Sequence, residues 1–184
     1  MKRIVAVLLV VVIAAGFAVA TMFRRGLSTR RQPTATEAMI ARVMRRLATP
    51  SSARNARNPV ELTGDALAEG RGHWADHCAS CHANDGSGQT EMGRNLYPKA
   101  PDMRQPRTQD LTDGELFAII KNGIRLTGMP AWGDPSGADD AETWKLVHFI
   151  RPLPKMTPRE IEEMKRMNPV SAEELKEREF LEGR

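Results

Sequence analysis

The 184-residue chain contains few cysteines, few aromatic residues and, in its first third, almost no acidic residues. Its two cysteines, Cys78 and Cys81, belong to one short motif, which excludes the disulfide framework of small secreted proteins. Aromatic residues make up 5% of the chain and are not interleaved with the basic ones, so the pI near 9.4 does not indicate nucleic-acid binding. Neither a tandem repeat nor strand-like alternation occurs, which argues against β and repeat architectures.

Charge is distributed unevenly along the chain. Residues 1–60 carry 11 Lys and Arg against a single acid, Glu37, whereas residues 61–184 carry 16 against 22 acids. The basic excess therefore lies beside the one long apolar run of the sequence, and the remainder is acidic. This difference predicts that the two parts of the chain face different surroundings.

An uncharged run extends from Ile4 to Phe23 and, as a helix, is long enough to cross a bilayer. We therefore expect residues 1–23 to form a single-pass anchor in the cell inner membrane. Ala18-Val19-Ala20 also fits a signal-peptide cleavage site, so the alternative is a soluble periplasmic protein after cleavage. The apolar run continues past that site, which favours the anchor.

Residues 24–62 are predicted to form a basic amphipathic helix followed by a linker. Thr34 and Glu37 have the spacing of a capping box at a helix start. The apolar residues that follow share one helical face: Ile40, Val43, Met44 and Leu47. Arginines occupy the other face, so this helix either lies on an anionic membrane or docks on the domain that follows. Proline, serine and asparagine residues at 48–62 predict the linker.

Residues 63–154 are predicted to form the one globular domain, with residues 155–184 as a helical C-terminal extension. Start and stop signals predict helices at about 65–77, 116–121 and 140–151. The two long stretches between them, 83–110 and 123–138, are rich in glycine and proline, and loops of this length usually wrap a ligand. Capping boxes at Thr157 and Ser171 predict two short helices in the extension.

The motif Cys78-Ala79-Ser80-Cys81-His82 follows the first of these helices. Cys-x-x-Cys-His is the signature of haem c attachment, because two thiols at this spacing reach both vinyl groups along one porphyrin edge. The adjacent imidazole then lies under the iron, so Cys78 and Cys81 are predicted to bind haem and His82 to be an axial ligand. A thioredoxin-like thiol pair needs a βαβ context and a zinc site needs a second ligand pair, and the sequence offers neither.

With this motif the chain resembles the class I cytochrome c family, in its small bacterial monohaem branch, over about residues 64–152. Gly70 and Trp74 match the first helix of the family, which crosses a C-terminal helix that here carries Trp144. Gly93-Arg94-Asn95-Leu96 is similar to the family's Gly-Pro-Asn-Leu, with arginine in place of proline. The resemblance implies an all-α fold, in which three main helices and long loops surround one haem, preceded by a transmembrane helix and followed by short C-terminal helices.

The resemblance also implies the second axial ligand. Residues 122–130 look like the family's loop that presents a methionine, which assigns this role to Met129, with Met92 and Met103 as rivals. The carbonyl that orients the proximal imidazole comes from the proline in the family, so here Arg94 or the Tyr97-Pro98 stretch is expected to supply it. Arg94, Tyr97 and Trp132 are interpreted either as contacts to the haem propionates or as loop packing.

A haem with histidine and methionine as axial ligands has no open site, which is the chemistry of an electron carrier rather than of an enzyme. The family attaches haem outside the cytoplasm. The predicted function is therefore single-electron transfer at the periplasmic face of the inner membrane, between redox donor and acceptor proteins of a respiratory chain. The alternatives are a subunit that works only within a dehydrogenase or oxidase complex, and a gas-sensing or peroxidatic haem protein. The acidic domain predicts a partner with a basic patch.

Overall fold

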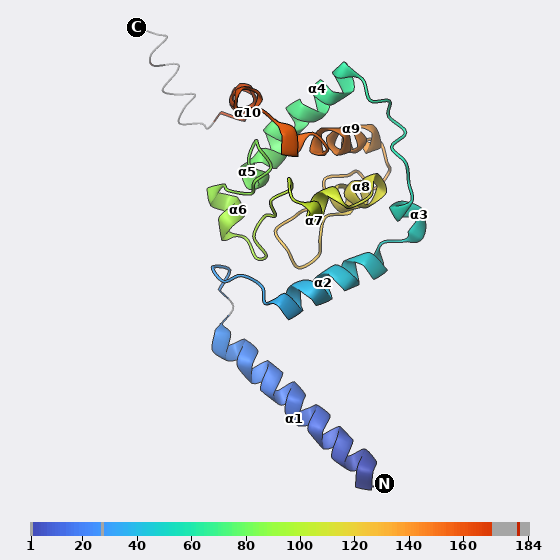
Figure 1. Ribbon diagram of the computed structural model, residues 1–184, viewed down its shortest axis with the longest axis vertical. Helices are drawn as coiled ribbons and strands as arrows, with labels where there is room; N and C mark the ends of the chain where they lie inside the picture. Colours follow the sequence, from blue (N-terminus) through green and yellow to red (C-terminus); the bar gives the residue numbers. More distant parts are fainter. Residues whose placement is uncertain (1, 27, 171–179, 181–184) are drawn as a thin grey trace.

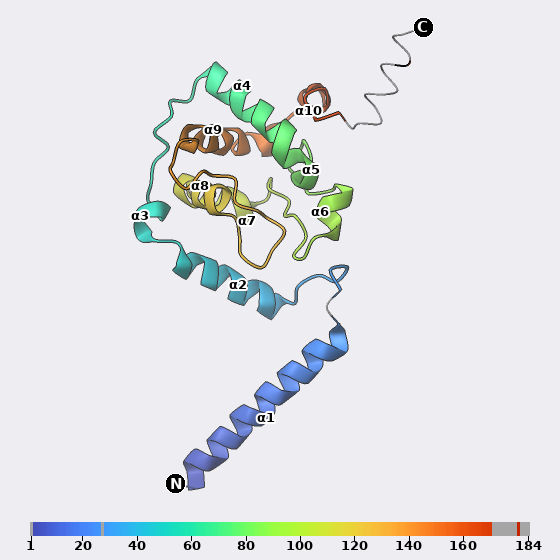
Figure 2. The same cartoon turned by 180° about the vertical axis from the view of Figure 1, so that it is seen from behind.

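The structure is a computed structural model of the chain and describes residues 2–26, 28–170 and 180. The described residues form helices and no strand, as predicted. In Figure 1 the helix α1 (Lys2–Arg25) runs away from the rest of the molecule, and α2 (Ala35–Ala48) lies between α1 and the remaining helices. Those helices pack together into one body, and Figure 2 shows the same arrangement from behind.

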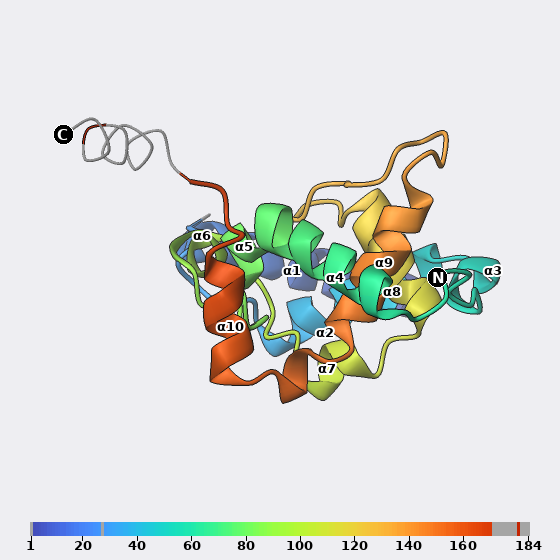
Figure 3. The ribbon, with the colours of Figure 1, turned by 90° about the horizontal axis from the view of Figure 1, so that it is seen from above.

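Three helices form the centre of this body: α4 (Gly64–His73), α8 (Asp113–Asn122) and α9 (Asp140–Ile150). α4 crosses α9 (Figure 3) so closely at Gly70 that a Cβ atom there would overlap the carbonyl oxygen of Lys145. Next to this crossing, the rings of Trp74 and Phe149 lie 5.6 Å apart between centroids. On the other side of α9, Trp144 stacks on Phe117 of α8 at 4.1 Å. The predicted crossing of the first and last helices is confirmed.

The first helix is predicted over residues 65–77, and the helical chain in fact continues to His82 with a change of geometry. The Thr63 side chain caps its start by accepting a hydrogen bond from the backbone N–H of Ala66 (3.1 Å). After α4 the backbone widens into the π-helical turn η1 (Trp74–Cys78) and returns to α-helix in α5 (Ala79–His82). Such π turns are often found at functional sites. Here the turn ends at the first cysteine of the motif.

The first stretch predicted as a long loop, 83–110, contains two one-turn helices. These are α6 (Glu91–Asn95), which Thr90 caps, and α7 (Pro106–Gln109). A single turn is too short to give a helical period in the sequence, which explains why the prediction missed both. The second stretch, 123–138, contains no helix.

The C-terminal extension shares the core of the domain. The short 3₁₀ turn η2 (Leu153–Lys155) leads to α10 (Pro158–Lys165), whose predicted capping box at Thr157 is confirmed. Met164 of α10 is fully buried in the core that also contains Trp74 and Leu153. The second predicted capping box, at Ser171, lies outside the described residues.

The stretch predicted as a linker, 48–62, also packs against the domain. It contains α3 (Ser51–Arg54), which approaches the start of α8 so closely that a Cβ atom at Gly114 would overlap the Ala53 carbonyl oxygen. Further along, Asn58 donates a hydrogen bond to the Trp144 carbonyl oxygen (2.9 Å). His148 donates one to the carbonyl oxygen of Val60 (2.8 Å), which assigns this histidine a packing role. The stretch is irregular, as its composition predicts, and it is held to the domain.

Candidate functional site

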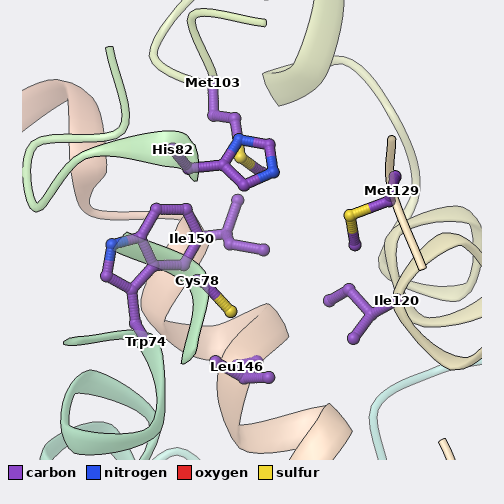
Figure 4. A pocket seen from close by; sticks show the side chains of 8 residues that line it. All are labelled: Trp74, Cys78, His82, Met103, Ile120, Met129, Leu146 and Ile150. Carbon is purple, nitrogen blue, oxygen red and sulfur yellow. The ribbon is translucent and has the colours of Figure 1, made fainter. Parts of the chain in front are cut away.

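The residues predicted to bind haem converge on one apolar pocket (Figure 4). Eight side chains line it: Trp74, Cys78, His82, Met103, Ile120, Met129, Leu146 and Ile150. Three of the four predicted site residues are therefore together, namely Cys78, His82 and Met129. Cys81, the fourth, is half-buried and does not line the pocket. The walls come from η1, α5, α8, α9 and two loops. Several of these segments are far apart in the sequence.

Packing fixes the ring of His82 at the edge of this pocket. The rings of Trp74 and His82 lie 5.7 Å apart between centroids. Trp74 Nε1 donates a hydrogen bond to the Ala83 carbonyl oxygen (3.1 Å). Ala83 has a φ of +63°, which is unfavourable for a residue with a Cβ atom, so this hydrogen bond holds a strained turn directly after His82.

The His82 imidazole has the state that metal coordination requires. Burial lowers the pKa of His82 to about 4, so the ring is neutral at neutral pH. Nδ1 of the ring is buried and has no hydrogen-bond partner among the described residues. Neither Arg94 nor the Tyr97-Pro98 stretch supplies to His82 Nδ1 the carbonyl that was expected there. The side chain of Arg94 is engaged elsewhere, since its Nη1 donates a hydrogen bond to the Gln89 carbonyl oxygen (3.2 Å). A neutral imidazole with an unpartnered nitrogen, set in an apolar pocket, fits the iron of a haem.

The cysteines do not have the character of a redox-active thiol pair. Both are free rather than joined in a disulfide. Burial, and after it the nearby Cys81, raises the pKa of the Cys78 thiol to about 12, whereas a nucleophilic cysteine needs a lowered pKa. The Cys78 sulfur points into the pocket (Figure 4), where a thioether to a porphyrin edge would lie.

Met129 reaches the pocket from a loop whose shape is fixed by hydrogen bonds. Gly123 ends α8 with a φ of +65°, a conformation that glycine adopts without strain. Within the loop, the Ile124 N–H donates to the Met129 carbonyl oxygen (3.1 Å), and the Met129 N–H donates to Thr127 Oγ1 (3.1 Å). The loop is therefore closed on itself immediately around Met129.

The two rival methionines occupy different places. Met103 lines the pocket, but its N–H donates to the Gly86 carbonyl oxygen (2.8 Å), which holds it on the same chain segment as His82. Figure 4 shows Met103 beside His82, with Met129 approaching from the opposite wall. Met92, on α6, is 54% exposed and does not line the pocket. Of the three, Met129 alone faces His82 from across the pocket.

Two aromatic residues that were interpreted as propionate contacts or loop packing make contacts within the protein. The ring of Trp132 lies 5.3 Å from that of His77, the residue before Cys78. Tyr97 lies beside Glu37 of α2; burial and then the charge of this carboxylate raise the pKa of Tyr97. The contact between His77 and Trp132 joins the attachment segment to the Met129 loop. No local sequence pattern signals such a contact between distant residues.

Comparison with known proteins agrees with the geometry. Residues 65–150 match the family model described as cytochrome C oxidase, cbb3-type, subunit III, and the matched range contains all four predicted site residues. No curated protein matches the chain significantly. The family match, together with the Cys-x-x-Cys-His spacing, shows that residues 65–150 form a class I c-type cytochrome domain that carries covalently bound haem c.

Proposed function

We propose that the chain is a membrane-anchored electron carrier whose haem is attached through Cys78 and Cys81 and ligated by His82 and Met129. A c-type cytochrome domain is typical of haem-based electron transfer, and of carriers rather than enzymes. The observation that carries the proposal is the placement of His82 and Met129 on opposite sides of one apolar pocket.

Each residue of the pocket has a definite task in this proposal. A haem held by these residues would supply one-electron chemistry through the ferrous and ferric states of its iron. His82, neutral at neutral pH, provides an imidazole nitrogen as one ligand. The soft thioether of Met129 favours the ferrous state and raises the reduction potential relative to a second histidine. The surrounding apolar side chains exclude water: Trp74, Ile120, Leu146 and Ile150.

The proposal places α1 in the cell inner membrane, with the haem domain on the periplasmic side. Within α1, the 20 residues Lys2–Thr21 have a mean hydropathy of 2.9 and are long and apolar enough to span a bilayer. An apolar helix at this position also fits a signal sequence, and its continuation past Ala20 favours retention. A reporter fused to the C-terminus tests the side: we expect a periplasmic reporter to be active, and activity of a cytoplasmic reporter alone would contradict the proposal.

Carbon monoxide tests whether the haem site is closed. We expect the visible spectrum of the reduced wild-type protein to remain unchanged under carbon monoxide, because Met129 occupies the position that the gas needs. The Met129→Ala variant should open that position and bind the gas. Binding to the wild type at neutral pH would support a gas-sensing or peroxidatic protein and would refute the carrier.

A second candidate function is that of a subunit working only within an oxidase complex. The matched family is described as subunit III of a cbb3-type cytochrome C oxidase. Residues 61–155 carry 10 Lys and Arg against 14 acids, a balance that suits a partner with a basic patch. Purification from native membranes in mild detergent separates the candidates. A fixed stoichiometric partner would support the subunit, and isolation of the cytochrome alone would support the carrier.

A further inference from the structure

α2 presents an apolar face that no part of the described chain covers. Five large apolar side chains form it and are between 49% and 80% exposed: Met39, Ile40, Val43, Met44 and Leu47. We call this face the α2 stripe. No residue of α2 is buried. A contiguous apolar face of this kind is unusual on a surface in water and marks a contact with another molecule or with a membrane.

α2 is least exposed on the face opposite the stripe. The half-buried residues of α2 are Ala38 and Arg45, which lie about two helical turns apart and therefore share a face. The helical rotation places the α2 stripe on the other side. The alternative in which the stripe docks on the haem domain is thus not what the structure shows.

Both ends of α2 are tied to the domain, so the outward direction of the stripe is fixed. At its start, the Glu37 carboxylate lies beside Tyr97, and burial and then this charge raise the pKa of that phenol. Just after its end, Arg54 of α3 donates a hydrogen bond from Nη1 to the carbonyl oxygen of Arg46 (2.8 Å). Thr112, the cap of α8, donates in turn to the carbonyl oxygen of Arg54 (2.6 Å). The helix is therefore held from both sides rather than tethered at one point.

The surroundings of the α2 stripe are basic. Residues 24–60 carry nine Lys and Arg against one acid, Glu37. Arg42 and Arg46 are exposed, and the helical rotation places both on one side of α2, between the stripe and the half-buried face. Only residues 26–34 separate α2 from the end of α1, and Figure 1 shows α2 between α1 and the haem domain. An apolar face bordered on one side by arginines, next to a spanning helix, matches a bilayer surface with anionic headgroups, because apolar side chains enter the acyl region and arginines pair with phosphates.

We propose that α2 lies in the surface of an anionic bilayer, with the α2 stripe facing the acyl chains, and that it holds the haem domain in one orientation on the membrane. This inference rests on the proposed retention of α1 as an anchor. The Tyr97 contact of Glu37 and the packing of Leu96 against Gly128 connect α2 to the loop that carries Met129. That loop is thereby held near the bilayer.

Spin labels on single introduced cysteines test the proposal in the full-length protein with its haem, since the native cysteines are occupied by the haem. Three positions have nearly equal exposure within the protein: Met44 in the α2 stripe (64%), Leu62 before α4 (64%) and Val10 in α1 (66%). The proteins are reconstituted into vesicles of phosphatidylcholine alone, or of phosphatidylcholine with an equal amount of phosphatidylglycerol. The accessibility of each label to oxygen, relative to a water-soluble nickel chelate, distinguishes lipid from water.

In the anionic vesicles we expect the Met44→Cys label to shift to the oxygen-rich ratio of the Val10→Cys label, while the Leu62→Cys label keeps the ratio of a label in water. In phosphatidylcholine alone, the Met44→Cys label should shift back toward water. Equal depth in both vesicle types would overturn the role assigned to anionic lipid.

Three further outcomes separate this inference from the function proposed above. A Met44→Cys label in water beside a Val10→Cys label in lipid overturns the inference and leaves the anchor standing. A Met44→Cys label shielded from both reagents means that a protein, such as a second copy, covers the stripe, which also overturns it. A Val10→Cys label in water overturns both the anchor and the inference. The haem spectrum of the same samples reports the electron-carrier site independently.

Discussion

In the haem domain, Val147, Ile150 and Met164 are at most 1% exposed, whereas in α1 and α2 every large apolar side chain whose exposure is described is at least 49% exposed. The residue types are similar in both regions, and the difference is what covers them. Within the domain, apolar side chains bury one another and thereby drive folding. No other part of the described chain covers the large apolar side chains of α1 and α2, as expected of surfaces that face a bilayer.

The largest difference between the two regions is expected at the haem attachment. Replacing both Cys78 and Cys81 with serine removes the thiols that form the thioethers, so the protein should lose its covalently bound haem completely. Intact mass spectrometry of the denatured protein measures this. The variant should still sediment with membranes, because α1 contributes nothing to haem binding. A variant that retained haem after denaturation would show that the attachment sites lie elsewhere.

Met164→Ala probes whether α10 belongs to the core. Because Met164 is fully buried, its truncation should lower the free energy of unfolding by about 2–5 kcal/mol. Chemical denaturation in detergent solution measures the change. Met167→Ala is the matched control, since Met167 is 42% exposed and follows α10 directly. If the two variants were equally stable, the extension would be a separate appendage rather than part of the domain.

Gly70→Ala tests the crossing of α4 and α9. The new methyl group would overlap the backbone at Lys145, so we expect the free energy of unfolding to fall by about 1–3 kcal/mol. Gly72→Ala, two residues further along the same helix, has open space around its Cβ position and should instead stabilise the protein by about 0.5–1 kcal/mol. The same denaturation experiment compares them, and a shared sign for the two effects would contradict the observed packing.

Met44→Ala makes the same substitution as Met164→Ala, but in α2, where no residue is buried. Because Met44 contacts no core, the free energy of unfolding in detergent solution should change by no more than about 0.5 kcal/mol. A loss similar to that of Met164→Ala would mean that the α2 stripe packs on protein after all.

Local patterns in the sequence predicted local structure well. The capping boxes at Thr34 and Thr157 are confirmed, because each depends on hydrogen bonds within a few residues of the chain. The crossing of α4 and α9 followed from the family resemblance, which carries tertiary information that a single pattern lacks. The π turn before Cys78 and the single-turn helices α6 and α7 were not predicted, since none of them is long enough to give a hydrophobic period.

The remaining features depend on contacts between distant segments. Ile120 and Leu146 line the pocket from two different helices, and each looks like an ordinary core residue in the sequence. The direction of the α2 stripe was also undetermined. Lipid and protein offer an apolar face similar free energies of burial. Only the exposure pattern along α2, in which Ala38 and Arg45 are half-buried on the opposite face, shows which way the stripe points.

The most direct measurement of the haem-site proposal is a redox titration with visible spectra of the wild type, Met129→Ala and Met103→Ala. We expect Met129→Ala to lower the reduction potential and change the ferric spectrum, because the iron loses the thioether that favours its ferrous state. Met103→Ala should keep the ferric spectrum of the wild type, since Met103 lies on the His82 side of the pocket. If Met129→Ala keeps the wild-type potential and spectrum, Met129 is not the ligand and the proposed closed site is wrong.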